Sequence, residues 1–317
     1  MLDRFGRKIE YLRISVIDRC NLRCVYCMPE EGISPISHEQ VLRYEEIVKL
    51  VKIATELGIN KIRITGGEPL VRKGLINLIT MLKEIDEIKD ISLTTNGILL
   101  ERYLDDLINA GLDRVNISLD SLNPEIYKKI TRRGNLDDVM RGLKKAIDSS
   151  IKPIKINVVT MKNINDNLED FAKLSIKEPV HIRFIEFMPV FGVEKIEGLT
   201  EEEMINELSK YGRLIKTVNP FGYGPATYYK YENAKGTIGL ICSNSHSFCD
   251  KCNRLRLTSD GRLKPCLFGE EEVDVKNMLR NNASDNILKE AFKKAIYLKP
   301  KERNKNKRIH YMHYVGG

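Results

Sequence analysis

The chain has 317 residues, which is enough to bury one large core or a core with an appended module. Its 52 basic and 44 acidic residues give a formal net charge of +8, an excess that suits either nucleic acid or a small anionic substrate. No stretch approaches the roughly 20 apolar residues that span a bilayer, and the N-terminal segment lacks the apolar core of a secretion signal, so we expect a cytoplasmic protein without a membrane partner.

Short β-branched segments alternate with longer helical patterns up to about residue 187, as in βαβ units with a parallel sheet. In residues 47–57 the apolar positions recur at a spacing of three to four, which predicts one buried helical face. Gly58 and Gly111 are predicted to end helices, and Asn123 before a proline is predicted to begin one. The six predicted strands are 12–17, 61–65, 91–95, 114–119, 154–160 and 181–187. Six such units predict an α/β fold, an incomplete (β/α)6 barrel of the TIM type.

Side chains suited to binding follow several of these strands. Active sites of parallel barrels gather at the C-terminal ends of the strands, so we expect these side chains to lie together. They are Thr65, Gly66, Thr94, Ser118 and Met188. The alternation fades after residue 190, which predicts a barrel domain of residues 1–190 and a C-terminal module of residues 191–317.

Three cysteines follow the first predicted strand. Cys20, Cys24 and Cys27 are separated by three and then two residues. Three thiolates in a tight loop can bind three irons of a cubane iron–sulfur cluster and leave the fourth iron open to a ligand that is not protein. Ordinary buried cysteines or a zinc knuckle are the alternatives. The odd total of seven cysteines argues against a secreted disulfide framework and favours metal sites in a reducing compartment.

A second set of three cysteines lies in the C-terminal module. Two residues separate Cys249 from Cys252, and thirteen separate Cys252 from Cys266. Paired thiols at the shorter spacing are also a zinc half-site, for which Cys242 or His246 is a candidate fourth ligand. The spacing alone leaves zinc and an iron–sulfur cluster as alternatives.

Basic residues fall at positions that favour an anionic ligand. Arg254 and Arg256 lie two apart, so in an extended segment they point to the same side, and guanidinium groups suit phosphate oxygens. Further cations lie within the predicted strands: Arg13, Arg63, Lys155 and Arg183. Inside a barrel they would be costly without an anion, and a nucleoside triphosphate has the required charge. Scaffold salt bridges are the alternative interpretation.

Three motifs carry a resemblance to known enzymes. The segment DRCNLRCVYCMP at residues 18–29 resembles the signature loop of the radical S-adenosylmethionine (SAM) enzymes, and Gly66, Gly67, Glu68 and Pro69 resemble their second motif. The segment FCDKCNRLRLTSDGRLKPCLF at residues 248–268, with the terminal Gly316 and Gly317, resembles the GTP 3′,8-cyclase family of molybdenum cofactor biosynthesis. This resemblance runs almost from end to end.

The resemblance implies two 4Fe–4S clusters, one for each cysteine set, and SAM as a cofactor. Reduction of the first cluster would split SAM into methionine and a 5′-deoxyadenosyl radical, and the second cluster would present an open iron to the guanine. The implied SAM contacts are Tyr26, Gly66, Gly67, Glu68, Ser118 and Met188. The implied GTP contacts are Arg13, Arg63, Thr94, Lys155, Arg183, Arg254, Leu255 and Arg256. The implied catalytic residues are Arg13, Arg254, Arg256, Gly316 and Gly317.

The implied reaction abstracts hydrogen from C3′ of GTP and joins C3′ to C8, giving 3′,8-cyclo-7,8-dihydro-GTP. Cyclic pyranopterin monophosphate synthase would use this product, an external donor would supply electrons, and a homodimer is expected by family analogy. A radical SAM enzyme that modifies a peptide is one alternative, and it predicts no affinity for GTP. A zinc-containing nucleic-acid-binding protein is the other, and it predicts zinc without iron and association that weakens steeply with salt. We expect no nucleic-acid partner.

Overall fold

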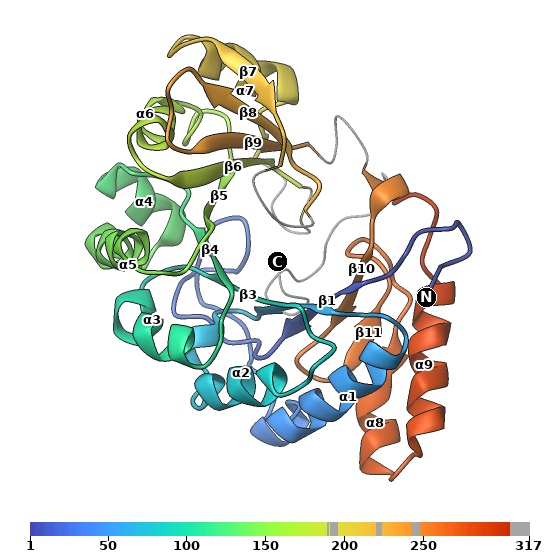
Figure 1. Ribbon diagram of the computed structural model, residues 1–317. Coiled ribbons are helices and arrows are strands. Elements are labelled where there is room, and N and C mark those ends of the chain that lie inside the picture. The colour runs from blue at the N-terminus through green and yellow to red at the C-terminus, as the bar shows by residue number, and fades with distance from the viewer. Residues whose placement is uncertain (189, 191–195, 220–223, 243–247, 305–317) are drawn as a thin grey trace.

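The computed structural model describes residues 1–188, 190, 196–219, 224–242 and 248–304. Helices and strands alternate through the first two thirds of the chain, and short strands with two helices follow (Figure 1). The strands are β1 (Tyr11–Ser15), β2 (Lys61–Thr65), β3 (Asp90–Thr95), β4 (Arg114–Ser118), β5 (Ile154–Thr160), β6 (Val180–Glu186), β7 (Leu214–Thr217), β8 (Thr227–Tyr231), β9 (Thr237–Ile241), β10 (Arg254–Leu257), β11 (Arg262–Lys264) and β12 (Val273–Asp274). The α-helices are α1 (Tyr44–Glu56), α2 (Leu75–Lys83), α3 (Leu100–Asn109), α4 (Pro124–Thr131), α5 (Leu136–Asp148), α6 (Glu169–Lys177), α7 (Glu201–Ser209), α8 (Val275–Arg280) and α9 (Asp285–Tyr297). Three single turns of 3-10 helix are η1 (His38–Gln40), η2 (Pro69–Val71) and η3 (Cys249–Lys251).

All twelve strands belong to one curved sheet in the order β12-β11-β10-β1-β2-β3-β4-β5-β6-β9-β8-β7. Helices α1 to α6 lie on its outer side (Figure 1). The strands from β1 to β6 pair in parallel, which confirms the predicted partial barrel. Two strands from the C-terminal third continue the parallel pairing, β10 beside β1 and β9 beside β6. Within the described residues the outermost strands, β12 and β7, are not joined, so the barrel is open.

Local sequence signals explain where the elements begin and end. The apolar face predicted in α1 is buried, including Ile47 and Leu50 at 0% exposure. Gly58 and Gly111 have φ values of +88° and +95°, which L side chains rarely adopt, and each lies just after a helix as predicted. Asn123 accepts hydrogen bonds from two amides of the first turn of α4, which is a helix N-cap.

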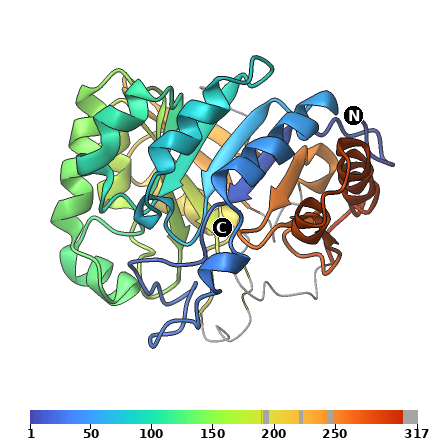
Figure 2. The same ribbon diagram turned by 90° about the horizontal axis from the view of Figure 1, so that it is seen from below.

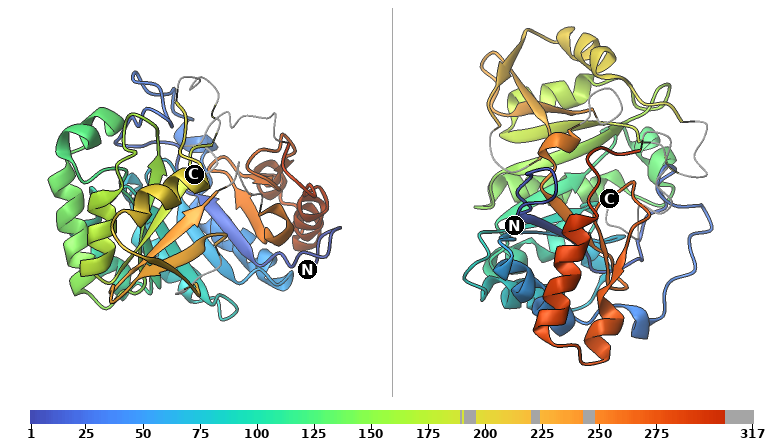
Figure 3. Two further views of the ribbon diagram at one scale, coloured as in Figure 1. Left: turned by 90° about the horizontal axis from the view of Figure 1, so that it is seen from above. Right: turned by 90° about the vertical axis from the view of Figure 1, so that its right-hand side faces the viewer.

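The C-terminal third packs against the barrel. Helices α8 and α9 lie along the edge of the sheet formed by β10 to β12 (Figure 3). Ion pairs join them to α1, from Lys289 to Glu56 at 2.6 Å and from Arg280 to Glu46 at 2.9 Å. The N-terminal segment also lies beside α9 (Figure 2). Since both predicted parts share one sheet, the domain boundary near residue 190 stays a prediction. Among the described residues, no helix combines the length and the apolar character that crossing a bilayer requires.

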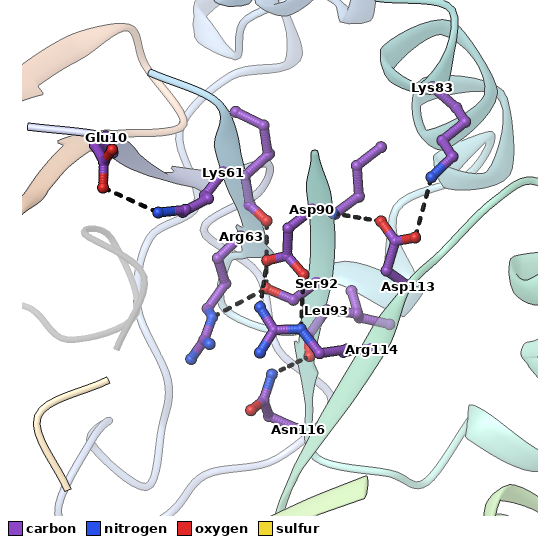
Figure 4. A network of polar contacts seen from close by, with 12 residues as sticks. Glu10, Lys61, Arg63, Lys83, Asp90, Ser92, Leu93, Asp113, Arg114 and Asn116 are labelled. Atoms are coloured by element: carbon purple, nitrogen blue, oxygen red, sulfur yellow. Dashed lines mark hydrogen bonds and ion pairs between the residues drawn. The ribbon is translucent and has the colours of Figure 1, made fainter. Parts of the chain in front are cut away.

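A polar network closes the end of the barrel at which β2, β3 and β4 begin (Figure 4). Asp90 accepts two hydrogen bonds from the Arg114 guanidinium, one of them from Nε at 2.6 Å. Both side chains are about nine-tenths buried, at 11% and 10% exposure. The negative charge of Asp90 also acts on the buried Lys155, and the side chain of Arg63 lies nearby in Figure 4. The carboxylate of Asp90 therefore offsets the charges of two buried cations, Arg114 and Lys155.

We expect Asp90→Asn to lower the free energy of unfolding by about 3–5 kcal/mol, because the change leaves a buried guanidinium without its carboxylate. Urea unfolding of the cluster-free protein measures this loss. The control is Glu101→Gln, which breaks the ion pair with Arg141, where the two side chains are 46% and 54% exposed. The control should change the free energy of unfolding by no more than about 1 kcal/mol. Equal losses in the two variants would contradict the prediction.

Candidate active site

The first three cysteines lie in the loop that follows β1. Cys20, Cys24 and Cys27 all line one central cavity, and none of the three forms a disulfide within the described part of the chain. The amides of Cys27 and Met28 donate to the Cys24 carbonyl at 2.9 and 3.1 Å, which closes the loop into a tight turn. The sequence spacing therefore places three thiols on one wall of the cavity.

The end of α4 supports this loop from outside. The Arg132 guanidinium donates from Nη1 to the carbonyls of Arg23 and Met28, both at 3.0 Å. The Arg23 amide donates in turn to the Thr131 carbonyl at 3.1 Å. Since these contacts fix the backbone on both sides of Cys24 and Cys27, the loop is held in place by the helix.

The donor set fits three irons of a 4Fe–4S cluster. Burial raises the pKa of Cys20 to about 11 and that of Cys24 well above its usual range, so these thiolates need a neighbouring cation, which iron supplies. The Cys20 sulfur also accepts N–H hydrogen bonds from Leu22 at 3.4 Å and from the Asn96 side chain at 3.8 Å. Such donors stabilise a metal-bound thiolate.

Glu68 ties the second motif to the end of β3. Its buried carboxylate accepts hydrogen bonds from the Leu70 amide at 3.0 Å, the Thr95 hydroxyl at 2.7 Å and the Asn96 amide at 2.7 Å. Burial raises the pKa of Glu68 to about 7. The Asn96 side chain also donates to the Cys20 sulfur, so Asn96 links Glu68 to the first cysteine loop.

Gly66 and Gly67 are required by the packing of two loops. A Cβ on Gly67 would lie 2.2 Å from the Arg19 carbonyl oxygen, and one on Gly66 would lie 2.8 Å from the Ile17 carbonyl oxygen. The Gly67 amide donates to that Ile17 carbonyl at 2.6 Å. Both glycines line the cavity, so they let the second motif approach the cysteine loop while facing a ligand.

Tyr26 is anchored at the end of β4. Its hydroxyl donates to Oδ2 of Asp120 at 2.6 Å, and Oδ1 of Asp120 accepts from the Val159 amide at 2.8 Å. Burial, with the nearby Asp120 carboxylate, raises the pKa of Tyr26, and burial raises the pKa of Asp120 to about 6. The sequence analysis missed Asp120. Its position two residues after the end of β4 is the signal that could have identified it, because active-site residues of parallel barrels follow the strands.

Three other predicted residues, Thr94, Ser118 and Met188, also line the cavity. The hydroxyl oxygen of Thr94 and Oδ1 of Asn157 are buried there and have no hydrogen-bond partner among the described residues. Such atoms are free to bind a ligand. Asn157, a polar residue in the apolar strand β5, is a second residue that the sequence analysis missed.

The second three cysteines line the same cavity as the first three. Cys249 begins η3, Cys252 follows it, and Cys266 follows β11. Burial alone would raise the pKa of Cys252, but the positive charges of Arg254 and Lys299 lower it to about 6. A thiolate in a basic environment fits an iron–sulfur cluster, whose net charge with its thiolates is negative.

The two candidate fourth ligands of a zinc site are placed differently. Cys242 follows β9, is buried, and lines a second cavity together with Cys252. It is not among the described residues that line the central cavity. Burial raises the pKa of Cys242 to about 12. His246 lies outside the described residues.

Strand β10 brings two arginines into the site. It pairs in parallel with β1, so that Arg256 lies opposite Arg13 and Arg254 lies opposite Tyr11. Arg254 and Arg256 line the cavity, as predicted from their spacing. The side chain of Leu255 points the other way, into the core, at 0% exposure.

Further cations complete a basic wall. Arg13, Arg63 and Arg183 also line the cavity, and Arg183 donates to Oδ1 of Asn116 at 2.7 Å. The buried Lys155 is not among the described residues that line the cavity, but it interacts electrostatically with Arg183 and Arg63 of this wall.

The basic wall is electrostatically strained without an anion. Burial, and then the charge of Arg254, lowers the pKa of Arg256 to about 10. Burial, Arg256 and Arg63 lower the pKa of Arg13 well below its usual range, and burial with neighbouring arginines lowers that of Lys155 to about 6. An anionic ligand would relieve this repulsion. The last two predicted residues, Gly316 and Gly317, lie outside the described residues.

Known proteins share this architecture. The structure of SuiB from Streptococcus suis bound to S-adenosylmethionine matches with a TM-score of 0.64 at 16% sequence identity, covering 89% of this chain and 67% of that chain. The maturase HydG from Carboxydothermus hydrogenoformans matches with a TM-score of 0.52 at 18% identity, covering 69% of this chain and 56% of that chain. At these identities the matches show the fold alone.

Sequence comparisons give a closer relationship. The family model described as the radical SAM superfamily matches residues 14–175, and the model described as molybdenum cofactor synthesis C matches residues 180–305. The GTP 3′,8-cyclase of Petrotoga mobilis is 50% identical and covers 96% of this chain and 95% of its own length. The GTP 3′,8-cyclase of Thermodesulfovibrio yellowstonii is also 50% identical, over the full length of both chains. The chain therefore belongs to the GTP 3′,8-cyclase family of the radical SAM superfamily.

Proposed function

We propose that this chain is a radical SAM GTP 3′,8-cyclase, which converts GTP to (8S)-3′,8-cyclo-7,8-dihydroguanosine 5′-triphosphate in the first step of molybdenum cofactor biosynthesis. One observation carries this proposal beyond family membership. Two sets of three cysteines and six arginines line the same cavity, although they come from opposite parts of the sequence. Such a cavity suits two clusters with an anionic nucleotide between them.

In this proposal Cys20, Cys24 and Cys27 hold the first 4Fe–4S cluster, which when bound supplies the electron that cleaves SAM. The protein's part is to bind, orient and shield. SAM contacts fall to Tyr26, Gly66, Gly67, Glu68, Ser118 and Met188. Their support is that all six line the cavity beside the first cysteine loop.

Cys249, Cys252 and Cys266 hold the second 4Fe–4S cluster in the same proposal. GTP is bound by Arg13, Arg63, Thr94, Arg183, Arg254, Leu255 and Arg256, and Lys155, which is not among the described residues that line the cavity, adds positive charge near Arg183 and Arg63. The arginines carry the charge that a triphosphate requires, and the unpartnered Thr94 hydroxyl is available as a donor. Leu255 acts through its backbone, because its side chain is in the core.

The finer assignments rest on the family. We propose a cytoplasmic location, for which the odd number of cysteines, seven, argues because disulfide frameworks belong to oxidising compartments. An external donor supplies electrons, the chain acts as a homodimer, and cyclic pyranopterin monophosphate synthase takes the product. The catalytic role of Gly316 and Gly317 is likewise proposed from the family, and deleting both should lower product formation. Full product formation by the shortened chain would contradict that role.

An anaerobic assay tests the function directly. The protein is reconstituted with iron and sulfide, and then incubated with SAM, dithionite and GTP. We expect about eight irons per chain for two cubane clusters, together with 5′-deoxyadenosine, and a cyclised nucleotide that forms from GTP. About four irons plus zinc, with SAM cleavage but no cyclised nucleotide from GTP, would contradict the proposal.

A further inference from the structure

A buried lysine lies against the second cysteine set. Lys299 follows α9 in the sequence and is only 3% exposed. Its ammonium donates to the carbonyl of Arg254 and to the carbonyl of Pro265, both at 2.8 Å. Both hydrogen bonds hold the ammonium against the part of the chain that carries Cys252 and Cys266, and Lys299 lines the same cavity as these two cysteines.

These contacts join two separate pieces of the second cysteine set. Arg254 lies two residues after Cys252, and Pro265 directly precedes Cys266. The Arg254 carbonyl belongs to β10, and the Pro265 carbonyl directly follows β11, which is the antiparallel partner of β10. Lys299 thus fixes the distance between the backbone that presents Cys252 and the backbone that presents Cys266.

A second cation anchors the neighbouring residues. The buried Arg7 donates from Nη1 to the Cys249 carbonyl at 2.7 Å and from Nη2 to the Pro300 carbonyl at 2.7 Å. Its Nε pairs with Asp3 at 2.6 Å. The segment that contains Lys299 is therefore fastened to the same cysteine set from the opposite side, so the lysine has little freedom to move away.

The charge of Lys299 needs a negative partner. Among the described residues, its ammonium contacts two carbonyls and interacts with the thiols of Cys252 and Cys266 and with the positive Arg254, and none of these groups is a carboxylate. A fully desolvated ammonium is costly unless anionic groups surround it. Thiolates bound to a cluster supply that charge, and Arg254 by itself would repel the ammonium.

We propose that Lys299 is a positioning residue that raises the reduction potential of the second iron–sulfur cluster. This inference rests on the proposed assignment of that cluster to Cys249, Cys252 and Cys266. The potential of such a cluster depends on net charge, on hydrogen bonds to sulfur and on exposure to solvent. A buried ammonium beside the ligating cysteines supplies positive charge, and it stabilises the state with one more electron.

The test is a redox titration of the reconstituted holoenzyme with dithionite, followed by electron paramagnetic resonance. The second cluster is the one whose signal responds to GTP, and the first cluster, whose signal responds to SAM, is the internal reference. For Lys299→Met and Lys299→Gln we expect the ratio of reduced to oxidised second cluster at a fixed potential to fall about tenfold, which is about 59 mV for a one-electron couple. The midpoint of the first cluster should not move.

Two variants separate charge from structure. Lys299→Arg keeps the positive charge and should restore the midpoint to near that of the wild type. Lys301→Met removes an exposed positive charge two residues away and should change nothing. Lys299→Gln keeps hydrogen-bond donors for the two carbonyls, so it reports on the charge even where the methionine variant packs poorly.

An unmoved midpoint in both neutral variants that retain all their iron would overturn the proposal. Loss of about four irons from both, with full iron in Lys299→Arg, would overturn it in favour of a role in cluster assembly. A wild-type chain that takes up only about four irons would instead contradict the two-cluster function. The failure of the inference and the failure of the function are therefore distinguishable.

Discussion

Arg256→Ala should lower the formation of cyclised nucleotide at least about 100-fold and leave cleavage of SAM to 5′-deoxyadenosine largely intact. Arg256 is 6% exposed, lines the cavity and lies opposite Arg13 across β1 and β10. In the proposal Arg256 pairs with a phosphate group of GTP. Removing one partner of a buried, hydrogen-bonded charge pair costs about 2–5 kcal/mol of interaction free energy, and about 2.7 kcal/mol corresponds to a 100-fold change in rate. SAM cleavage is spared because Arg256 is neither a ligand of the first cluster nor a SAM contact in the proposal. Chromatographic measurement of both products in one reaction separates the two effects.

The matched control for Arg256 is an arginine on the next strand. Arg262 on β11 is 42% exposed and forms an ion pair with Asp260 at 3.2 Å. Arg262→Ala should leave both products within about twofold of the wild type, as is usual for an exposed ion pair. Arg256→Lys should fall between the two, because it keeps the charge but loses the guanidinium fork that binds two phosphate oxygens. Undiminished cyclisation in Arg256→Ala would remove this residue from the proposed GTP site.

Replacing one cysteine in either set should halve the iron content and have different effects on chemistry. Cys24→Ala and Cys252→Ala should each lower the iron from about eight to about four per chain. Cys24→Ala should abolish SAM cleavage, because the cluster that supplies the electron is lost. Cys252→Ala should still cleave SAM but form no cyclised nucleotide. Iron and sulfide analysis together with the two product assays measures these effects.

Cys242 provides the control for both cysteine variants. It is buried, and it lines the smaller cavity together with Cys252. Cys242→Ser should keep about eight irons and cyclise GTP, since three cysteines leave the fourth iron of the second cluster available. If Cys242→Ser lost about four irons, Cys242 would be a ligand of the second cluster. That result would contradict the proposal that guanine approaches an open iron.

The strands of the barrel were predictable because their signal is local. The predicted and observed limits of the first six strands agree within two residues, since each is a short β-branched run that becomes buried. The parallel strands β9 and β10 were not predicted. Their place beside β6 and β1 depends on pairing between distant segments, and a short strand such as Arg254–Leu257 carries no local sign of its partner.

The same distinction applies to the site. The cysteines and the glycines of the second motif were predictable from their spacing. Asp120, Asn157 and Lys299 were missed, because their importance lies in contacts that form only in the folded chain: a hydrogen bond to Tyr26, a buried oxygen in the cavity and two carbonyls near the second cysteine set. The alternation of side chains along β10 was predictable, and the opposition of Arg256 to Arg13 was not.

The pairing of β10 with β1 also affects how the protein is made. During synthesis, the first 190 residues contain all the ligands of the first cysteine set but none of the second. At that stage β1 and β6 have unpaired edges, which are sites of aggregation in incomplete sheets. Pairing between segments so distant in the chain is slow. A nascent chain therefore exposes the first cysteine loop to water and oxygen until its last third emerges, so delivery of iron and sulfide should follow the completion of translation.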